Sequence, residues 1–420
     1  MKKLAFILLS AVALVACDKS KNKYTCYEPV YTDAETFRTP AVFESPKSIT
    51  NNGNIYYKDE ILFVVEPNEG IHFIDNSNPS SPVNTGFLRI QGASGLAIKD
   101  NYLYVTALVD LVTIDVSNYA LPVEVDRQTE LFPTALPLME KNYPTKTIDK
   151  SKGIVTSWNA VKVEEETNTN PWPVWTGCFG CETLTTFDSG VGLANGSGSS
   201  SGAGTSGSFA LMTVHGEHLY VVDNWKLLPI DISNPLNKKF AEDVYLSWNV
   251  ETIFPNGDYL YMGTTTGMMI YDTQNPDMPS RIGSIAHARA CDPVVVDGDY
   301  AYVTVRSNGR CGGDINQLDV VNIADKTNPW LVESFEMTHP YGVGVDGNTV
   351  FVCDGDDGLK VFNDESPANI GNSLIKRYKD IEAIDIIPMN GIAMAIGENG
   401  IFQYDYTDLN NVHLISEIKF

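Results

Sequence analysis

The side chains of this sequence best suited to binding a ligand are basic and aromatic residues that fall between its apolar segments. Arginine and histidine can bind a carboxylate, a phosphate or an acidic glycan, because their N–H groups make charge-assisted hydrogen bonds to oxyanions. The candidate ligand-binding residues are Trp225, Trp248, His287, Arg289, Arg306, Arg310, His339 and Tyr341. The alternative is that these arginines pair with neighbouring acids and that the aromatic rings pack between loops.

Motifs for catalysis or metal binding are sparse. The sequence contains no G-x-S-x-G, H-E-x-x-H or phosphate-binding glycine motif, so no catalytic residue is assigned. Asp354, Asp356 and Asp357 faintly resemble a calcium loop, but the distant bidentate glutamate of such a loop is absent. We therefore predict neither a metal nor a cofactor.

A repeated strand must position these residues. Seven apolar segments end in an acidic or amide residue, at positions 75, 115, 231, 272, 322, 363 and 405, so that successive copies are 40, 116, 41, 50, 41 and 42 residues apart. A step of about 40 to 45 residues with several short strands is typical of a four-stranded propeller blade. The sequence predicts an all-β propeller with seven blades, and eight is the alternative if the long step hides a degenerate blade.

Two of the copies resemble a known family. Residues 111–118 read LVTIDVSN and residues 227–235 read LLPIDISNP, and both are similar to the LVIVD-repeat β-propeller proteins of bacterial envelopes. The resemblance extends from about Asn54 to the C-terminus, apart from the long insertion. It implies a propeller and, in many members, an envelope lipoprotein, but no defined chemistry. Asn322 and Asn363 depart from the aspartate of the pattern, and Pro229 interrupts one strand.

The long step places an insertion between the second and third repeats. Residues 128–208 contain a possible strand pair around Ile154 to Val163 and a Gly/Ser-rich run over residues 196–208, which is typical of a flexible linker. Because the insertion joins an outer strand to the next inner strand, it should emerge on the same face as the candidate ligand-binding loops. The propeller itself is predicted over residues 48–420.

The N-terminus indicates export. Met1-Lys2-Lys3 precedes an apolar stretch, and residues 14–17 read LVAC, which resembles a bacterial lipobox. We predict a signal peptide over residues 1–16 and lipid attachment at Cys17, followed by a polar tether and N-terminal extension over residues 17–47. Which membrane holds the anchor stays open, with the outer membrane preferred to the inner.

Six further cysteines fit an exported protein with disulfide bonds. Cys291 and Cys311 fall in loops expected on one face, so a bond between them would fix a long loop beside the channel. Cys178 and Cys181 could close a small disulfide loop, with a redox pair or half a zinc site as alternatives. Cys353 lies on a predicted strand and fits a buried free thiol.

The net charge of −24, from 53 acidic and 29 basic residues, argues against a nucleic-acid partner. The expected function is a lipid-anchored, extracytoplasmic binding or scaffolding module that meets an envelope protein or a glycan through its loops. The alternatives are a glycan-acting hydrolase or lyase with carboxylates at the channel mouth, and a structural role in a larger envelope complex.

Overall fold

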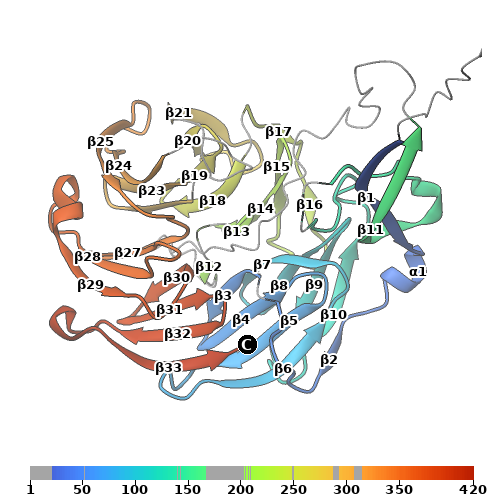
Figure 1. The fold of residues 1–420 in the computed structure, drawn as a ribbon, viewed down its shortest axis with the longest axis horizontal. Coiled ribbons are helices and arrows are strands. Elements are labelled where there is room, and N and C mark those ends of the chain that lie inside the picture. Colours follow the sequence, from blue (N-terminus) through green and yellow to red (C-terminus); the bar gives the residue numbers. More distant parts are fainter. Residues whose placement is uncertain are drawn as a thin grey trace, which may run out of the picture.

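The computed structural model describes residues 21–51, 53–139, 141, 143–166, 203, 205–206, 208, 210–247, 250–286, 293–306 and 315–420. Seven antiparallel sheets are arranged around a central axis, as Figure 1 shows, and an eighth, two-stranded sheet lies outside this ring. The prediction of an all-β propeller is therefore confirmed, with seven blades rather than eight. Among the described residues, no helix has the length and apolarity needed to cross a bilayer.

Each blade is built from consecutive strands, ordered from the channel outward. Blade 1 contains β3 (Ile55–Lys58), β4 (Ile61–Glu66), β5 (Gly70–Asp75) and β6 (Val83–Arg89), and blade 2 contains β7 (Ala93–Lys99), β8 (Tyr102–Ala107), β9 (Asp110–Asp115) and β10 (Val123–Gln128). Blade 3 contains β13 (Met212–His215), β14 (His218–Asp223), β15 (Lys226–Asp231), β16 (Lys239–Phe240) and β17 (Val244–Tyr245). Blade 4 contains β18 (Val250–Asn256), β19 (Tyr259–Thr264), β20 (Gly267–Asp272) and β21 (Ser280–Ala286).

The last three blades follow the same order. Blade 5 contains β22 (Val294–Asp297), β23 (Tyr300–Arg306), β24 (Asn316–Asn322) and β25 (Trp330–Glu336). Blade 6 contains β26 (Val343–Asp346), β27 (Thr349–Cys353), β28 (Leu359–Asn363) and β29 (Leu374–Tyr378), and blade 7 contains β30 (Ala383–Met389), β31 (Ile392–Gly397), β32 (Gly400–Asp405) and β33 (His413–Lys419).

This order gives the ring two different faces. We call the loop face the one that carries the connections between second and third strands and those between consecutive blades. The opposite turn face carries the short turns between first and second and between third and fourth strands. The buried apolar core lies between neighbouring blades, as in the cluster that joins Tyr261 of blade 4 to Val295 of blade 5.

The residue that ends each repeat strand has the same role in all seven blades. Its side-chain oxygen accepts a hydrogen bond from the backbone N–H two residues later, as Asp75 does from Ser77 at 2.9 Å and Asn322 from Ala324 at 3.1 Å. The intervening residue, for example Asn76, donates its N–H to the hairpin between the first two strands. Asparagine can therefore replace aspartate in two repeats, because this turn needs an acceptor oxygen and no charge.

Pro229 changes one blade locally. It lies in β15, and the outer strand beside it is divided into β16 and β17, which pair with the two ends of β15. A proline has no backbone N–H to donate, so the ladder is interrupted at this point. The rest of the blade is regular.

The ring closes through side chains rather than through a shared strand. Blades 1 and 7 meet through an apolar cluster and through two buried amides, in which Asn76 Nδ2 donates to Gln403 Oε1 at 2.9 Å and Gln403 Nε2 donates to Asn76 Oδ1 at 2.7 Å. Ser416 adds a hydrogen bond to the carbonyl of Pro79 at 2.6 Å. The closing contacts therefore include a polar pair that is satisfied only when both partners are present.

Replacing Asn76 alone with leucine should lower the free energy of unfolding by about 1–2 kcal/mol, because the buried Gln403 amide loses its partner. The double variant Asn76→Leu with Gln403→Leu should recover much of this loss, since no amide is left unpaired. Urea unfolding of the three proteins measures the difference. Equal losses in the single and double variants would contradict a stabilising amide pair at the closure.

The N-terminal extension and the insertion form one structure outside the ring. Strand β1 (Lys21–Thr32) pairs antiparallel with β11 (Ile154–Glu166), so the strand expected near Ile154 pairs with the N-terminal segment rather than with its own neighbours. Figure 1 shows this ribbon beside blade 2. The short helix α1 (Ala34–Phe37) follows β1, and β2 (Val42–Glu44) adds an outer strand to blade 1.

Candidate functional site

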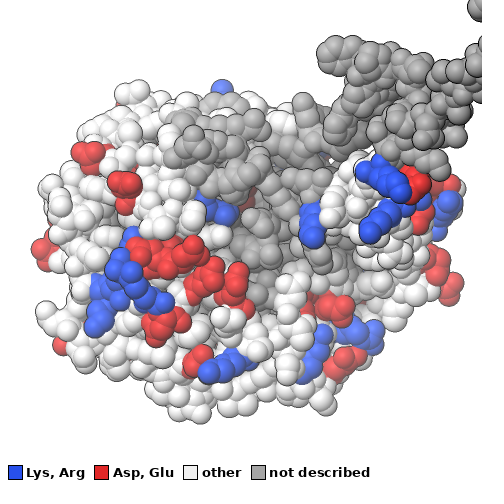
Figure 2. Space-filling view, in the orientation of Figure 1, with Lys and Arg blue, Asp and Glu red and all other residues white. Residues whose placement is uncertain are grey.

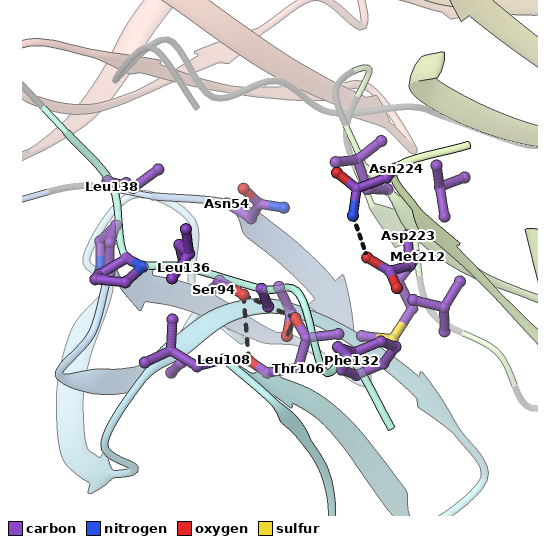
Figure 3. A pocket seen from close by; sticks show the side chains of 18 of the residues that line it. Asn54, Ser94, Thr106, Leu108, Phe132, Leu136, Leu138, Met212, Asp223 and Asn224 are labelled. Carbon is purple, nitrogen blue, oxygen red and sulfur yellow. Dashed lines mark hydrogen bonds between the residues drawn. The ribbon is translucent and has the colours of Figure 1, made fainter. Parts of the chain in front are cut away.

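A cleft of about 130 Å³ lies on the loop face, between the ends of the inner strands of blades 1 to 4 and residues 132–138 of the insertion. Figure 3 shows Phe132, Leu108 and Met212 on one side of it. These three side chains are buried. The cleft is therefore apolar over much of its surface, as small-molecule sites commonly are.

Polar groups lie around this apolar surface. Asn224 Nδ2 donates to Asp223 Oδ1 at 2.8 Å and to Thr134 Oγ1 at 3.1 Å, and the hydroxyls of Ser94 and Thr106 are 3.0 Å apart. Burial raises the pKa of Asp223, and the nearby Lys226 partly opposes this shift. Asp223 is the one ionisable side chain among the described residues that line the cleft.

The outer structure holds the insertion against the cleft. Trp158 Nε1 donates to the carbonyl of Pro137 at 2.8 Å, and Lys150 Nζ donates to that of Pro133 at 2.8 Å. The Trp158 ring packs against Tyr27 of β1, with ring centroids 6.1 Å apart. The position of one cleft wall therefore depends on the β1–β11 ribbon.

The N-terminal segment is tied to blade 2 as well. Arg38 makes hydrogen bonds of 2.9 and 3.1 Å to the two carboxylate oxygens of Asp110, which is fully buried. Phe37 packs against Leu108 and Val109. Residues 33–44, which belong to the predicted tether and N-terminal extension over residues 17–47, are thus part of the folded body.

Part of the predicted flexible linker lies in the central channel. Thr205 and Ser206 form β12, which pairs with the channel-facing edge of β3, and Ala203 forms a bridge with Lys99 near the turn face. Ser208 is fully buried and contacts blades 6 and 7 near the loop face. At these positions the linker is bound along the channel wall.

Ser208 meets an unusual acid there. Asp385 on β30 lies 3.3 Å from the Ser208 hydroxyl, which also accepts a hydrogen bond from the backbone N–H of Val343 at 3.3 Å. Burial raises the pKa of Asp385 well above its ordinary value. Its Oδ2 atom is buried and has no hydrogen-bond partner among the described residues.

The structure brings together three of the predicted ligand-face residues. The Arg306 guanidinium lies 4.0 Å from the centre of the Tyr341 ring, and both Tyr341 and His339 surround Gly355 in the second connection of blade 6. Trp225 is on blade 3, in the turn next to the cleft residue Asn224, and its side chain is 40% exposed. Trp248, His287, Arg289 and Arg310 lie outside the described residues.

The calcium-like segment is an ion-pair network. Asp354 is fully buried and accepts hydrogen bonds from the N–H groups of Thr338 and His339, and Lys360 Nζ also contacts it. Asp357 binds Arg377 at 2.9 Å. Among the described residues, no group of His, Cys, Asp and Glu has a metal-binding arrangement.

Carboxylates gather beside this network. Figure 2 shows acidic and basic side chains close together over blades 6 and 7. Partial burial raises the pKa of the exposed Glu382, and the neighbouring Glu398 and Asp356 raise it further. These acids lie near the start of the inner strand β30, which is at the channel mouth.

The predicted cysteine chemistry falls largely outside the described residues: this applies to Cys17, Cys178, Cys181, Cys291 and Cys311. Cys353 is a buried free thiol, as predicted from its strand, and burial raises its pKa well above the ordinary value. Cys26, on strand β1, is also free and buried.

Comparison with known proteins agrees with the fold and the repeats. The LVIVD repeat model matches residues 92–129, 206–244 and 288–337, which correspond to blades 2, 3 and 5. The chain thus contains LVIVD repeats in three segments and is consistent with an LVIVD-repeat family, as the sequence resemblance predicted. No curated protein matches the chain.

Solved structures resemble it at low sequence identity. The computationally designed Ika8 protein has a TM-score of 0.50 and 9% identity, over 89% of each chain. BamB from Moraxella catarrhalis has a TM-score of 0.46 and 7% identity, over 90% of this chain and 95% of BamB. A protein from Lactobacillus plantarum has a TM-score of 0.49 and 10% identity, over 79% of this chain and 86% of that one. Such similarity concerns the fold and does not assign a function.

The residues that line the cleft were not predicted from the sequence. Asp223 ends strand β14, and Asn224 begins the next turn, where its left-handed backbone with φ of 54° is an ordinary property of turns. Phe132 is in the insertion, where no repeat pattern indicates its place. The useful signal was Trp225, which was predicted for the ligand face and lies directly after Asn224.

Proposed function

We propose that this protein is a lipid-anchored, extracytoplasmic propeller that acts as a non-catalytic binding or scaffolding module of the cell envelope. The lipid site is Cys17, and the partner meets the loop face. The observation that supports binding over catalysis is the cleft: its described lining supplies one carboxylate, Asp223, whereas acid–base hydrolysis of a glycan needs two.

A glycan-acting hydrolase or lyase is the second candidate. Its support is the raised pKa of Glu382 beside Glu398 and Asp356, since a raised carboxyl pKa suits a general acid. These carboxylates do not line the cleft. If the protein is a glycan-acting enzyme, Glu382→Gln should abolish glycan turnover. If it is a binding module instead, Glu382→Gln should leave partner capture unchanged.

Capture of partners from the native envelope, after mild cross-linking, tests the binding function. Trp225→Ala, on the loop face, should lose a stoichiometric partner that wild type retains. The matched control is Tyr245→Ala, because Tyr245 is 75% exposed on the outer strand of the same blade. If only Tyr245→Ala loses the partner, the partner docks on the side of the blade. If wild type captures no partner, the scaffolding function is rejected.

The anchor is tested separately. Cys17→Ser should move the protein from the membrane fraction to the soluble fraction, because the acyl chains on this cysteine would be its attachment. An unchanged distribution between the fractions would reject lipid anchoring at Cys17.

A further inference from the structure

The cleft beside Asp223 has a definite chemical preference. We propose that it binds a primary alkylammonium group, and that its natural occupant is the side chain of a lysine on a protein partner. This inference rests on the proposed binding function, and it specifies the chemistry recognised at the cleft.

Charge is the first argument. The described lining contains no lysine, arginine or histidine, and Asp223 is its single ionisable group. The nearest described cation, Lys226, is already bound to Asp243 at 2.6 Å. An anionic ligand would meet a carboxylate without a compensating charge, whereas a cation would pair with it. The net charge of −24 also attracts cations over longer distances.

The shape of the surface is the second argument. The half-buried side chains of Ala135, Leu136 and Leu138 give the cleft an accessible apolar surface that a straight alkyl chain can cover, with its charged end at Asp223. A lysine side chain has this form, with four methylene groups and a terminal ammonium. The cleft volume of about 130 Å³ leaves room for a short alkyl chain.

The hydrogen-bonding groups are the third argument. An ammonium has three donors and no acceptor, so it needs several acceptor oxygens. Asn224 holds Asp223 through Oδ1, which leaves Oδ2 for a ligand, and the Asn54 side chain also lines the cleft. Asn224 itself is fixed by Thr134. The carboxylate is thus oriented before a ligand arrives.

A neutral sugar fits less well. Sugars commonly stack on an accessible aromatic face, and Phe132, the aromatic ring in the described lining, is 4% exposed. The hydroxyls of Ser94 and Thr106 also bind each other and backbone carbonyls. A sugar would therefore find few free partners along this wall.

Titration calorimetry with n-butylammonium tests the proposal on the intact protein. Butylammonium should bind at least about tenfold more tightly than n-butanol or butyrate, and Asp223→Asn should weaken it about tenfold or more. The matched control Glu217→Gln removes one charge from the turn face of the same blade and should leave binding unchanged. Equal binding of butanol and butylammonium would overturn the proposal.

The pH dependence gives a second readout. Butylammonium binding should weaken as pH falls through the pKa of Asp223, because protonation removes its charge. The described ionisable groups near Asp223 are Lys226 and Asp243, and the cleft walls from blades 1 and 2 and from residues 132–138 supply none. The same pH dependence in Asp223→Asn would assign the effect to another group and reject this role.

The source of the ammonium is tested with two further probes. Nα-acetyl-lysine N-methylamide should bind at least as well as butylammonium, whereas tenfold tighter binding of putrescine would favour a free polyamine and reject the lysine. The comparison of partner capture between wild type and Trp225→Ala is a separate measurement. If the wild-type protein captures a partner but does not bind butylammonium, this inference is overturned and the proposed function stands.

Discussion

Replacing Glu66 with alanine should lower the free energy of unfolding by about 3 kcal/mol at neutral pH. Glu66 ends β4 and is 1% exposed. Its carboxylate accepts hydrogen bonds from the backbone N–H and the hydroxyl of Thr50, and it contacts Lys47 Nζ and His72 Nε2, each at 2.9 Å. The alanine variant would leave the fully buried His72 without this partner.

The pKa of Glu66 gives the size of the effect. Burial alone would raise this pKa, but the hydrogen bonds from Thr50, Lys47 and His72 outweigh burial and lower it from 4.5 to about 2. Each unit of pKa difference between the folded and unfolded states is worth about 1.4 kcal/mol. The stabilisation is therefore fully present above pH 4.5 and is lost as pH falls from 4.5 towards 2.

His72 acts in the same direction. Burial lowers its pKa below 6.5, so the folded protein binds the proton less readily than the unfolded chain does. Stability from this group is present above pH 6.5 and declines as pH falls below that value. Wild type should therefore lose stability in acid through both groups.

Urea unfolding between pH 7 and pH 3 measures the Glu66 effect. The Glu66→Ala variant should be much less stable than wild type at pH 7, and the difference should shrink towards pH 3. The control is Glu69→Gln, because Glu69 is exposed in the following turn. A constant difference between wild type and Glu66→Ala at all pH values would contradict the assigned ionisation.

The propeller could be predicted from sequence because its repeats carry their own local chemistry. Each blade ends its third strand with an oxygen that binds a backbone N–H two residues later, so the same residue types recur at a fixed period. The neighbouring turns then follow from short-range contacts. Even the interruption at Pro229 had a predictable cause.

The structures outside the repeats could not be predicted in the same way. Strand β1 pairs with β11, and Lys23 lies opposite Glu164 although 141 positions separate them in the sequence numbering. No periodic pattern connects such distant segments. Composition was also misleading for Thr205 and Ser206, since serine and threonine are common in linkers and yet pair here with the free edge of β3.

The candidate site depends on these unpredicted structures. Residues 132–138 line the cleft because Trp158 and Lys150 hold their carbonyl groups. The repeat pattern could place Trp225 on the loop face, but it could not place Phe132 near Asp223. Sequence therefore predicted the face, and long-range packing determined where on it the cleft lies.

Replacing Asp385 with asparagine should raise the free energy of unfolding by about 2–3 kcal/mol at pH 7. Asp385 is fully buried on the inner strand of blade 7, and its Oδ2 has no partner among the described residues. An asparagine has nearly the same shape and can keep the contact of the Oδ1 atom with Ser208. It cannot ionise, so it avoids the cost of a buried charge.

The pH dependence should have the opposite sign to that of Glu66. Burial raises the folded-state pKa of Asp385 above the ordinary 3.8. Below pH 3.8 Asp385 is protonated in both the folded and the unfolded state and does not lower the free energy of unfolding. Stability is lost as pH rises from 3.8 towards the folded-state pKa. The advantage of Asp385→Asn should be large at pH 7 and should disappear near pH 3.

Unfolding of Asp385→Asn at both pH values, beside the exposed control Asp380→Asn, tests this assignment. Ser208→Ala adds a separate measurement, because it removes the acceptor of the Val343 N–H and should destabilise the protein by about 1 kcal/mol. If Asp385→Asn is no more stable than wild type at pH 7, a group outside the described residues satisfies the acid. If the variant is more stable, Ser208 of the channel segment contacts a buried acid, Asp385, that lowers the stability of the wild-type protein at pH 7.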